Sequence, residues 1–332
     1  MKKRLALFFI TVLMGLMIFT ACGSSENTEK LGSNVSDEKQ QEEISTIGDQ
    51  SQEEEPAATP TPTLSPTPTP EVMQPGRLML NLSQNMREYG SAEIDMSIVL
   101  DINMNDEQIK MLKDSGYYND IEIEPVFWLK AYGNFASNKD AAMATLNMEQ
   151  NQGGLVSKWA NSEYMQRNTE GDLLEYYFSA AEGSWVVYNQ GDSTTPDLTE
   201  WIEIFGVAQV SQLATMTVFE DIAVTEEGDK YFVDGIISFE RFLKITEVGN
   251  SLYASGAPLN PDDLEINVHA EFGKDDKKIQ FLSMYLANPK QLTQNDMAQI
   301  SELRFDVKFN ISPDGEKIVV PMDILNSAVS VN

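Results

Sequence analysis

An eleven-residue run with strict alternation constrains the fold of this chain more than any other feature. Apolar side chains occupy every second position from Ile94 to Met104, and all the positions between them are polar except Val99. Because successive side chains of a β-strand point to opposite faces, this run predicts a long strand with one buried face. A second long strand is expected over 121–135, where Pro125 marks an edge or a bulge.

Three further pairs of strand-like segments flank short turns that contain Gly, which predicts β-hairpins. The pairs are 174–178 with 184–188, 217–224 with 231–237, and 264–272 with 279–287. A strand over 141–148 is expected to pair with the second long strand. Strands over 304–311 and 317–320 are expected to close the chain across Pro313-Asp314-Gly315. Successive hairpins argue against a parallel sheet built from βαβ units.

Apolar residues at helical spacing predict a few short helices among these strands. The expected helices are 78–89, a segment starting at 197, a segment capped by Ser238, and 293–303. The predicted fold class is therefore α+β, a curved antiparallel sheet with a few helices packed on its concave face.

The first 21 residues have the form of an export signal. Met1-Lys2-Lys3-Arg4 is basic and is followed by an apolar run over 5–19, which is shorter than the about 20 apolar residues of a membrane-spanning helix. Phe19-Thr20-Ala21-Cys22 resembles the lipobox of bacterial lipoproteins, in which the cysteine is lipidated. We therefore expect lipidation at Cys22, which would hold the protein on the extracytoplasmic face of the cell membrane. Ordinary secretory cleavage with a free cysteine is the alternative.

Residues 22–75 are predicted to form a tether between this lipid anchor and a single folded domain over 76–332. The segment after Cys22 holds 11 acidic residues, two lysines and few large apolar side chains, a composition that favours disorder. Its Thr/Pro run over 59–70 favours extended polyproline geometry. The tether would act as a stalk or as an inert spacer.

The charge and the rare residue types exclude several classes of function. The chain has 23 Lys and Arg against 52 Asp and Glu, for a net charge of −29, so no nucleic-acid partner is expected. With one Cys and one His, neither an intrachain disulfide nor a Cys/His zinc site can form. No metal site and no cofactor are expected, because phosphate loops, dinucleotide fingerprints and the calcium-loop pattern are all missing from the sequence.

Catalysis is also not expected. His269 is the only histidine and lies on the polar side of an alternating strand, where a surface histidine is the simplest interpretation. A G-x-S-x-G nucleophile elbow does not occur in the sequence. Pairs of carboxylates are numerous, but none is set apart by an apolar flank. The protein is therefore predicted not to be an enzyme.

The order of elements resembles that of a known family. A helix over 78–89 runs into the long strand, a Tyr-rich strand and Gly turn lead to Trp185, and the chain ends in the apolar segment 318–328. In this order the chain is similar to envelope lipoproteins with a LolA/LppX-like half-barrel. The resemblance implies a half-barrel closed by helices over an apolar cavity that holds acyl chains. An acidic region over 106–124 departs from the family pattern.

Two functions from different classes follow from these observations. The first is non-catalytic binding of a lipid or other hydrophobic small molecule, since Met and aromatic residues are frequent in the predicted elements. The candidate lining residues are Met96, Ile98, Leu100, Phe127, Leu129, Trp185, Trp201, Phe205 and Phe242. The second is a protein-interaction or sensory module on a stalk. Its candidate face is the mixed side of the second strand: Val126, Trp128, Lys130 and Tyr132.

Overall fold

The structure is a computed structural model that describes residues 73–331, except residue 117 and the ranges 119–120, 205–212, 214–215, 246–263, 291–292, 294–297 and 313–316. The predicted export signal, Cys22 and most of the predicted tether lie outside the described residues.

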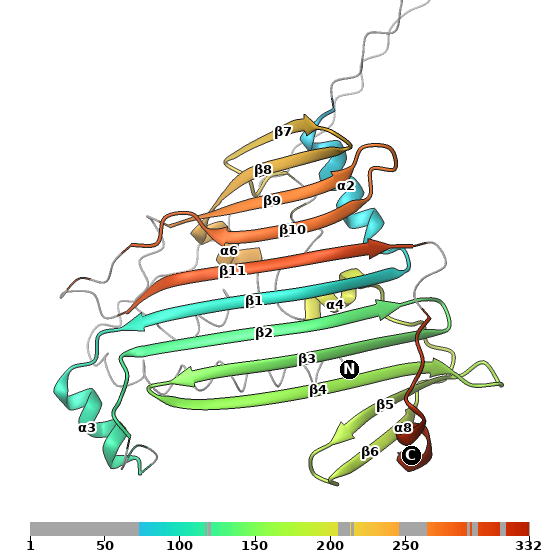
Figure 1. The fold of residues 1–332 in the computed structure, drawn as a ribbon, viewed down its shortest axis with the longest axis horizontal. Helices are drawn as coiled ribbons and strands as arrows, with labels where there is room; N and C mark the ends of the chain where they lie inside the picture. The colour runs from blue at the N-terminus through green and yellow to red at the C-terminus, as the bar shows by residue number, and fades with distance from the viewer. Residues whose placement is uncertain are drawn as a thin grey trace, which may run out of the picture. The chain divides into compact units, whose positions relative to one another are not determined.

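Twelve strands form one sheet in the order β12-β6-β5-β4-β3-β2-β1-β11-β10-β9-β8-β7 (Figure 1). The strands are β1 (Gly90–Ile102), β2 (Val126–Ser137), β3 (Ala141–Gln152), β4 (Leu155–Arg167), β5 (Leu173–Ser179), β6 (Ser184–Asn189), β7 (Asp221–Glu227), β8 (Lys230–Ser238), β9 (Glu265–Gly273), β10 (Ile279–Leu286), β11 (Ala298–Ile311) and β12 (Val329–Ser330). All neighbouring pairs are antiparallel except β12 with β6. The sheet is open, because β7 and β12 are its two edges.

The sheet consists of two meanders joined at its centre. Strands β1 to β6 follow one another on one side, and β7 to β11 follow one another on the other. The meanders meet where β1 pairs with β11 from Gly90↔Ile311 to Ile102↔Ala298. Segments about 200 residues apart in the sequence therefore form the central ladder.

The described helices are few and short. They are α2 (Pro75–Asn85), α3 (Asp106–Asp114), α4 (Leu198–Ile204), α6 (Phe239–Ile245) and α8 (Met322–Ser327). Leu82 of α2, Trp201 of α4 and Phe242 of α6 are buried in one cluster with the apolar side of the sheet. Helix α8 instead packs beside β6, and its Ile324 belongs to a second, smaller cluster.

Most of the predicted elements are confirmed. The alternation of β1 places Ile94, Met96 and Leu100 in the core, and the three hairpins form as β5–β6, β7–β8 and β9–β10. The second strand, expected from residue 121, begins only at Val126, so Pro125 directly precedes β2, and its carbonyl accepts a hydrogen bond from Ile102 N–H at 2.9 Å. A proline at the start of a strand costs no ladder hydrogen bond.

Two expectations about the C-terminal part of the chain were wrong. Residues 298–303 belong to β11 and not to a helix, because a register shift opposite Val99 and Leu100 gives Ile300 and Leu303 a helix-like spacing. Residues 317–320 form no strand. The acidic region 106–124 begins with a helix, α3, whose Asn105 and Gln108 form a capping box. The sequence also gave no indication of β4.

Gly133 lies at a position of β2 where the neighbouring backbone leaves no room for a side chain. A Cβ there would lie 2.6 Å from the Thr145 carbonyl oxygen. We expect Gly133→Ala to lower the free energy of unfolding by about 1–3 kcal/mol through overpacking. The measurement is the midpoint of chemical denaturation.

Gly76→Ala is the matched control for this change. A Cβ at Gly76 in α2 would meet Met216 Cγ at an ordinary 3.5 Å, and alanine favours a helix over glycine. This variant should be as stable as the parent or more stable. Equal losses in both variants would contradict the packing argument.

Candidate functional site: one apolar and one polar face

The register of the sheet collects the apolar side chains on one face. Cross-strand pairs place nine residues from nine strands in a single lateral row, which we call the methionine row. In strand order from β4 to β7 its members are Trp159, Met148, Ala131, Met96, Phe305, Met284, Val268, Gly235 and Ile222. The three methionines are each at most 6% exposed.

The structure brings most of the predicted lining residues together on this apolar face. The residues that share its buried cluster are Met96, Leu100, Phe127, Leu129, Trp201 and Phe242. Ile98 is partly buried against the same cluster. Phe205 lies outside the described residues.

The prediction that Trp185 lines this face was wrong. It packs with Tyr176, Tyr164 and Ile324 in the second cluster, and its ring lies 6.0 Å from that of Tyr164. Strand alternation puts Tyr176 on the face opposite to Glu175 and Leu173. Burial in this cluster raises the pKa of the Tyr176 hydroxyl above its ordinary value. Trp185 therefore supports the packing of α8 and does not line the apolar face.

Helix α4 is held against the apolar face at fixed points. The Ser137 hydroxyl donates to the Pro196 carbonyl at 2.6 Å, and the Thr195 hydroxyl donates to the Asn138 carbonyl at 2.7 Å. The Asp197 carboxylate accepts from Glu200 N–H at 2.9 Å, as an N-cap side chain does. These contacts fix the start of the helix that carries Trp201.

The opposite face of the sheet carries the predicted interaction residues. On β2 they point away from the core, and Tyr132 is 50% exposed. Val126 and Trp128 are partly buried, and Lys130 Nζ lies 5.4 Å from the centre of the Trp128 ring. The alternation expected for this strand is confirmed, while its role in binding a partner stays a prediction.

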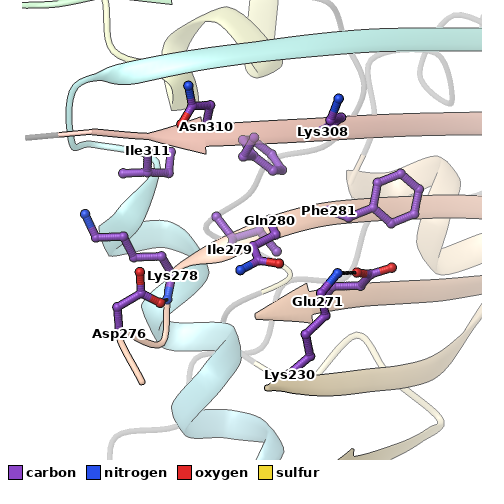
Figure 2. Close-up of a pocket in the computed structure, with 11 residues that line it drawn as sticks. Lys230, Glu271, Asp276, Lys278, Ile279, Gln280, Phe281, Lys308, Asn310 and Ile311 are labelled. Atoms are coloured by element: carbon purple, nitrogen blue, oxygen red, sulfur yellow. Dashed lines mark hydrogen bonds and ion pairs between the residues drawn. The ribbon is translucent and has the colours of Figure 1, made fainter. Parts of the chain in front are cut away.

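The same polar face has a groove of about 490 Å³ (Figure 2). It lies where the β10–β11 ladder stops at Phe281↔Lys308, although both strands continue. Each lysine of its lining faces a carboxylate: Lys230 with Glu271 at 2.5 Å, Lys278 with Glu88 at 3.1 Å, and Lys308 with Glu93 at 3.5 Å. Its charge is therefore largely balanced, and the groove has no strong preference for an anion.

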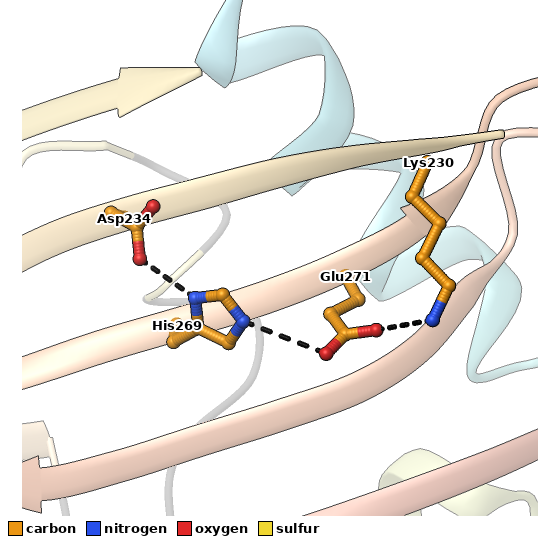
Figure 3. Close-up of polar contacts among 4 residues, drawn as sticks. All are labelled: Lys230, Asp234, His269 and Glu271. Atoms are coloured by element: carbon orange, nitrogen blue, oxygen red, sulfur yellow. Dashed lines mark hydrogen bonds and ion pairs between the residues drawn. The ribbon is translucent and has the colours of Figure 1, made fainter. Parts of the chain in front are cut away.

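His269 lies beside this groove in a row of charged side chains (Figure 3). Its Nδ1 lies 2.7 Å from Asp234 and its Nε2 lies 3.7 Å from Glu271. Because the two ring nitrogens face different carboxylates, these three residues cannot chelate one ion. Among the described residues, no group of three or more His, Cys, Asp or Glu side chains could hold a metal.

Three residues in successive cross-strand positions follow the order of an acid, a base and a nucleophile: Asp234, His269 and Ser283. The Ser283 hydroxyl is fully buried and makes no hydrogen bond within the described part of the chain. A nucleophile must reach the carbonyl carbon of its substrate, and the buried oxygen of Ser283 offers no approach. The arrangement therefore does not provide the geometry for acyl transfer.

Comparisons with known proteins give no family for the chain. No family model matches it, and no curated protein matches it. Among solved structures, a beta-barrel-like protein of a domain of unknown function from Brucella abortus is 9% identical, with a TM-score of 0.19 over 70% of this chain and 100% of that one. A domain named as an outer membrane lipoprotein-sorting protein from Vibrio parahaemolyticus is 7% identical, with a TM-score of 0.17 over 76% of this chain and 95% of that one. These likenesses are weak.

None of the helices in the described ranges is long and apolar enough to cross a bilayer.

The anchoring of α4 can be tested at Ser137. Ser137→Ala removes a buried donor and leaves the Pro196 carbonyl without it, so we expect the free energy of unfolding to fall by about 1–2 kcal/mol. Amide hydrogen exchange in α4 should become faster. Ser283→Ala is the control, because its buried hydroxyl makes no hydrogen bond among the described residues. That variant should be neutral or stabilising, and a loss as large as that of Ser137→Ala would contradict this assignment.

Proposed function

We propose that this protein binds an elongated hydrophobic ligand between the apolar face of its sheet and the helices α4 and α6. The observation that carries the proposal is the methionine row, which crosses nine strands without a charged side chain. Neighbouring strands lie about 4.8 Å apart, so the row extends for roughly 38 Å. That length accommodates an extended acyl chain.

The composition of the row suits a ligand of variable shape. Methionine has an unbranched, polarisable side chain that adapts to irregular partners. Ala131 lies between Met96 and Met148 in the row and has a much smaller side chain than either of them. A rigid core of branched side chains would resist such rearrangement, because protein interiors are close-packed.

The proposal places this binding domain on the outer side of a cell membrane. The basic and apolar N-terminus and the lipobox-like Phe19–Cys22 support export and lipidation, and the acidic and Thr/Pro-rich segment supports a tether. Together with the open antiparallel sheet, they support membership of the LolA/LppX-like envelope lipoproteins. An acidic domain gains no attraction from an anionic membrane, so its attachment would depend on the acyl chains of Cys22.

The anchor is tested by metabolic labelling with an alkyne analogue of palmitate. The full chain should incorporate the label, and Cys22→Ser should lose it, since no other cysteine exists in the chain. An unlabelled parent chain, with its N-terminus cleaved by ordinary signal peptidase, would contradict lipidation.

A second function is supported by the polar face. Tyr132 and the Lys130–Trp128 pair are accessible there, and the groove of about 490 Å³ lies on the same face. Ligand pockets commonly have volumes of about 300–1,000 Å³. A protein partner or a polar polymer of the envelope would use this face.

Native mass spectrometry distinguishes the two functions. The full chain carrying Cys22→Ser, purified without detergent, should retain non-covalent hydrophobic molecules in near-stoichiometric amount, and organic extraction identifies their class. A clean ligand-free mass that persists after incubation with lipid vesicles would contradict the apolar-ligand proposal.

Two adjacent residues of β2 provide matched variants for this experiment. Ala131 is buried on the apolar face, whereas Tyr132 is exposed on the polar face. Ala131→Leu should fill the space in the methionine row and reduce ligand occupancy several-fold, at a cost of about 1–3 kcal/mol in stability. Tyr132→Leu should leave occupancy unchanged. The reverse result would favour the polar face as the binding surface.

A further inference from the structure

Trp201 carries a hydrogen-bond donor that is not used among the described residues. The side chain is 1% exposed, and its buried indole N–H has no hydrogen-bond partner in the part of the chain that the structure describes. A buried donor without an acceptor loses its hydrogen bonds to water and gains nothing in return. Indole is normally placed in a core only where its N–H reaches a partner. A phenylalanine at this position would carry no such donor.

The position of the indole is fixed before any ligand binds. Its ring stacks on Phe135 with a centroid distance of 5.6 Å and an interplanar angle of 25°. Ala92 and Ala144 flank Phe135 on the neighbouring strands, and these small side chains let the indole lie close to the sheet. Together with the hydrogen bonds at Ser137 and Asp197, this packing holds the indole at a fixed place within the apolar layer.

The apolar surroundings of the indole limit which acceptor can bind. Glu163 follows Ala144 in the cross-strand row that contains Phe135, and Glu175 lies on the same face of β5. Both are at most 6% exposed. A ligand carboxylate would lose the hydration of its full charge in this layer. A neutral carbonyl oxygen would accept from the indole at a much smaller cost in lost hydration.

We propose that Trp201 Nε1–H binds the carbonyl oxygen of a neutral acyl ester or amide, so that the ligand is an esterified or amidated acyl chain and not a hydrocarbon or a free fatty acid. The inference rests on the proposed binding of an elongated hydrophobic ligand. The acyl chain would extend from Trp201 along the methionine row.

The test compares three ligands of similar length, each displacing the fluorescent hydrocarbon diphenylhexatriene from the full chain carrying Cys22→Ser. Methyl undecanoate should bind more tightly than dodecane or undecanoate. Trp201→Phe keeps the stacked ring and removes the donor. This variant should weaken the binding of methyl undecanoate by about three- to tenfold, the range expected for one neutral hydrogen bond. The affinity for dodecane should stay unchanged.

A second tryptophan provides the control. Trp185→Phe, which makes the same change in the second cluster and away from the apolar face, should not alter the ratio of ester to hydrocarbon affinity.

The outcomes separate the two proposals. If none of the three ligands displaces the probe, the proposed function fails. If the ligands bind and Trp201→Phe leaves the ratio of ester to hydrocarbon affinity unchanged, only the role of Trp201 is overturned.

Discussion

The pairing of β1 with β11 is the constraint on which the rest of the structure depends. It joins two meanders that are distant in sequence, and its register decides which side chains meet across the sheet. A slip of one residue would turn Met96 and Leu100 toward the polar face. Because Met96 lies opposite Phe305 and Ala131, the apolar sides of the two meanders join into one continuous surface.

This register also separates the two kinds of chemistry. The apolar face holds a Trp donor fixed above a wide surface of Met, Ala and Phe, and the polar face holds paired charges around a groove. The lysines of the groove are balanced by Glu271, Glu88 and Glu93, so polar ligands compete with existing ion pairs there. The methionine row holds no ionisable side chain, so a hydrophobic ligand there would compete with the packing of the helices and not with ion pairs.

The sequence predicts those elements whose burial differs between their two sides. β1 and the three hairpins alternate clearly, and so they are found from sequence alone. β4 has polar residues such as Asn161 and Glu163 on its inward side, which removes the alternation. The shift in strand register opposite Leu100 gives the apolar residues of 298–303 the spacing that is typical of a helix. Both failures reflect tertiary pairing that no local pattern records.

The candidate site likewise contains some residues whose position can be predicted from the sequence and others whose position cannot. Burial of Met96, Leu129 and Phe242 follows from their periodicity, whereas the position of Trp185 depends on α8, which packs beside β6 from the end of the chain. The unused donor of Trp201 is invisible in the sequence, since it depends on what surrounds the indole in three dimensions.

The edges of the sheet support binding on its faces and not by strand addition. An open sheet exposes unpaired backbone groups at its ends, and proteins protect such edges with charge or with short strands. β7 carries exposed Asp221, Glu226 and Glu227, and β12 has only two residues. A partner strand would meet repulsion at the first edge and few hydrogen bonds at the second. Both edges therefore disfavour binding by strand addition, which is consistent with the proposed use of the two faces of the sheet.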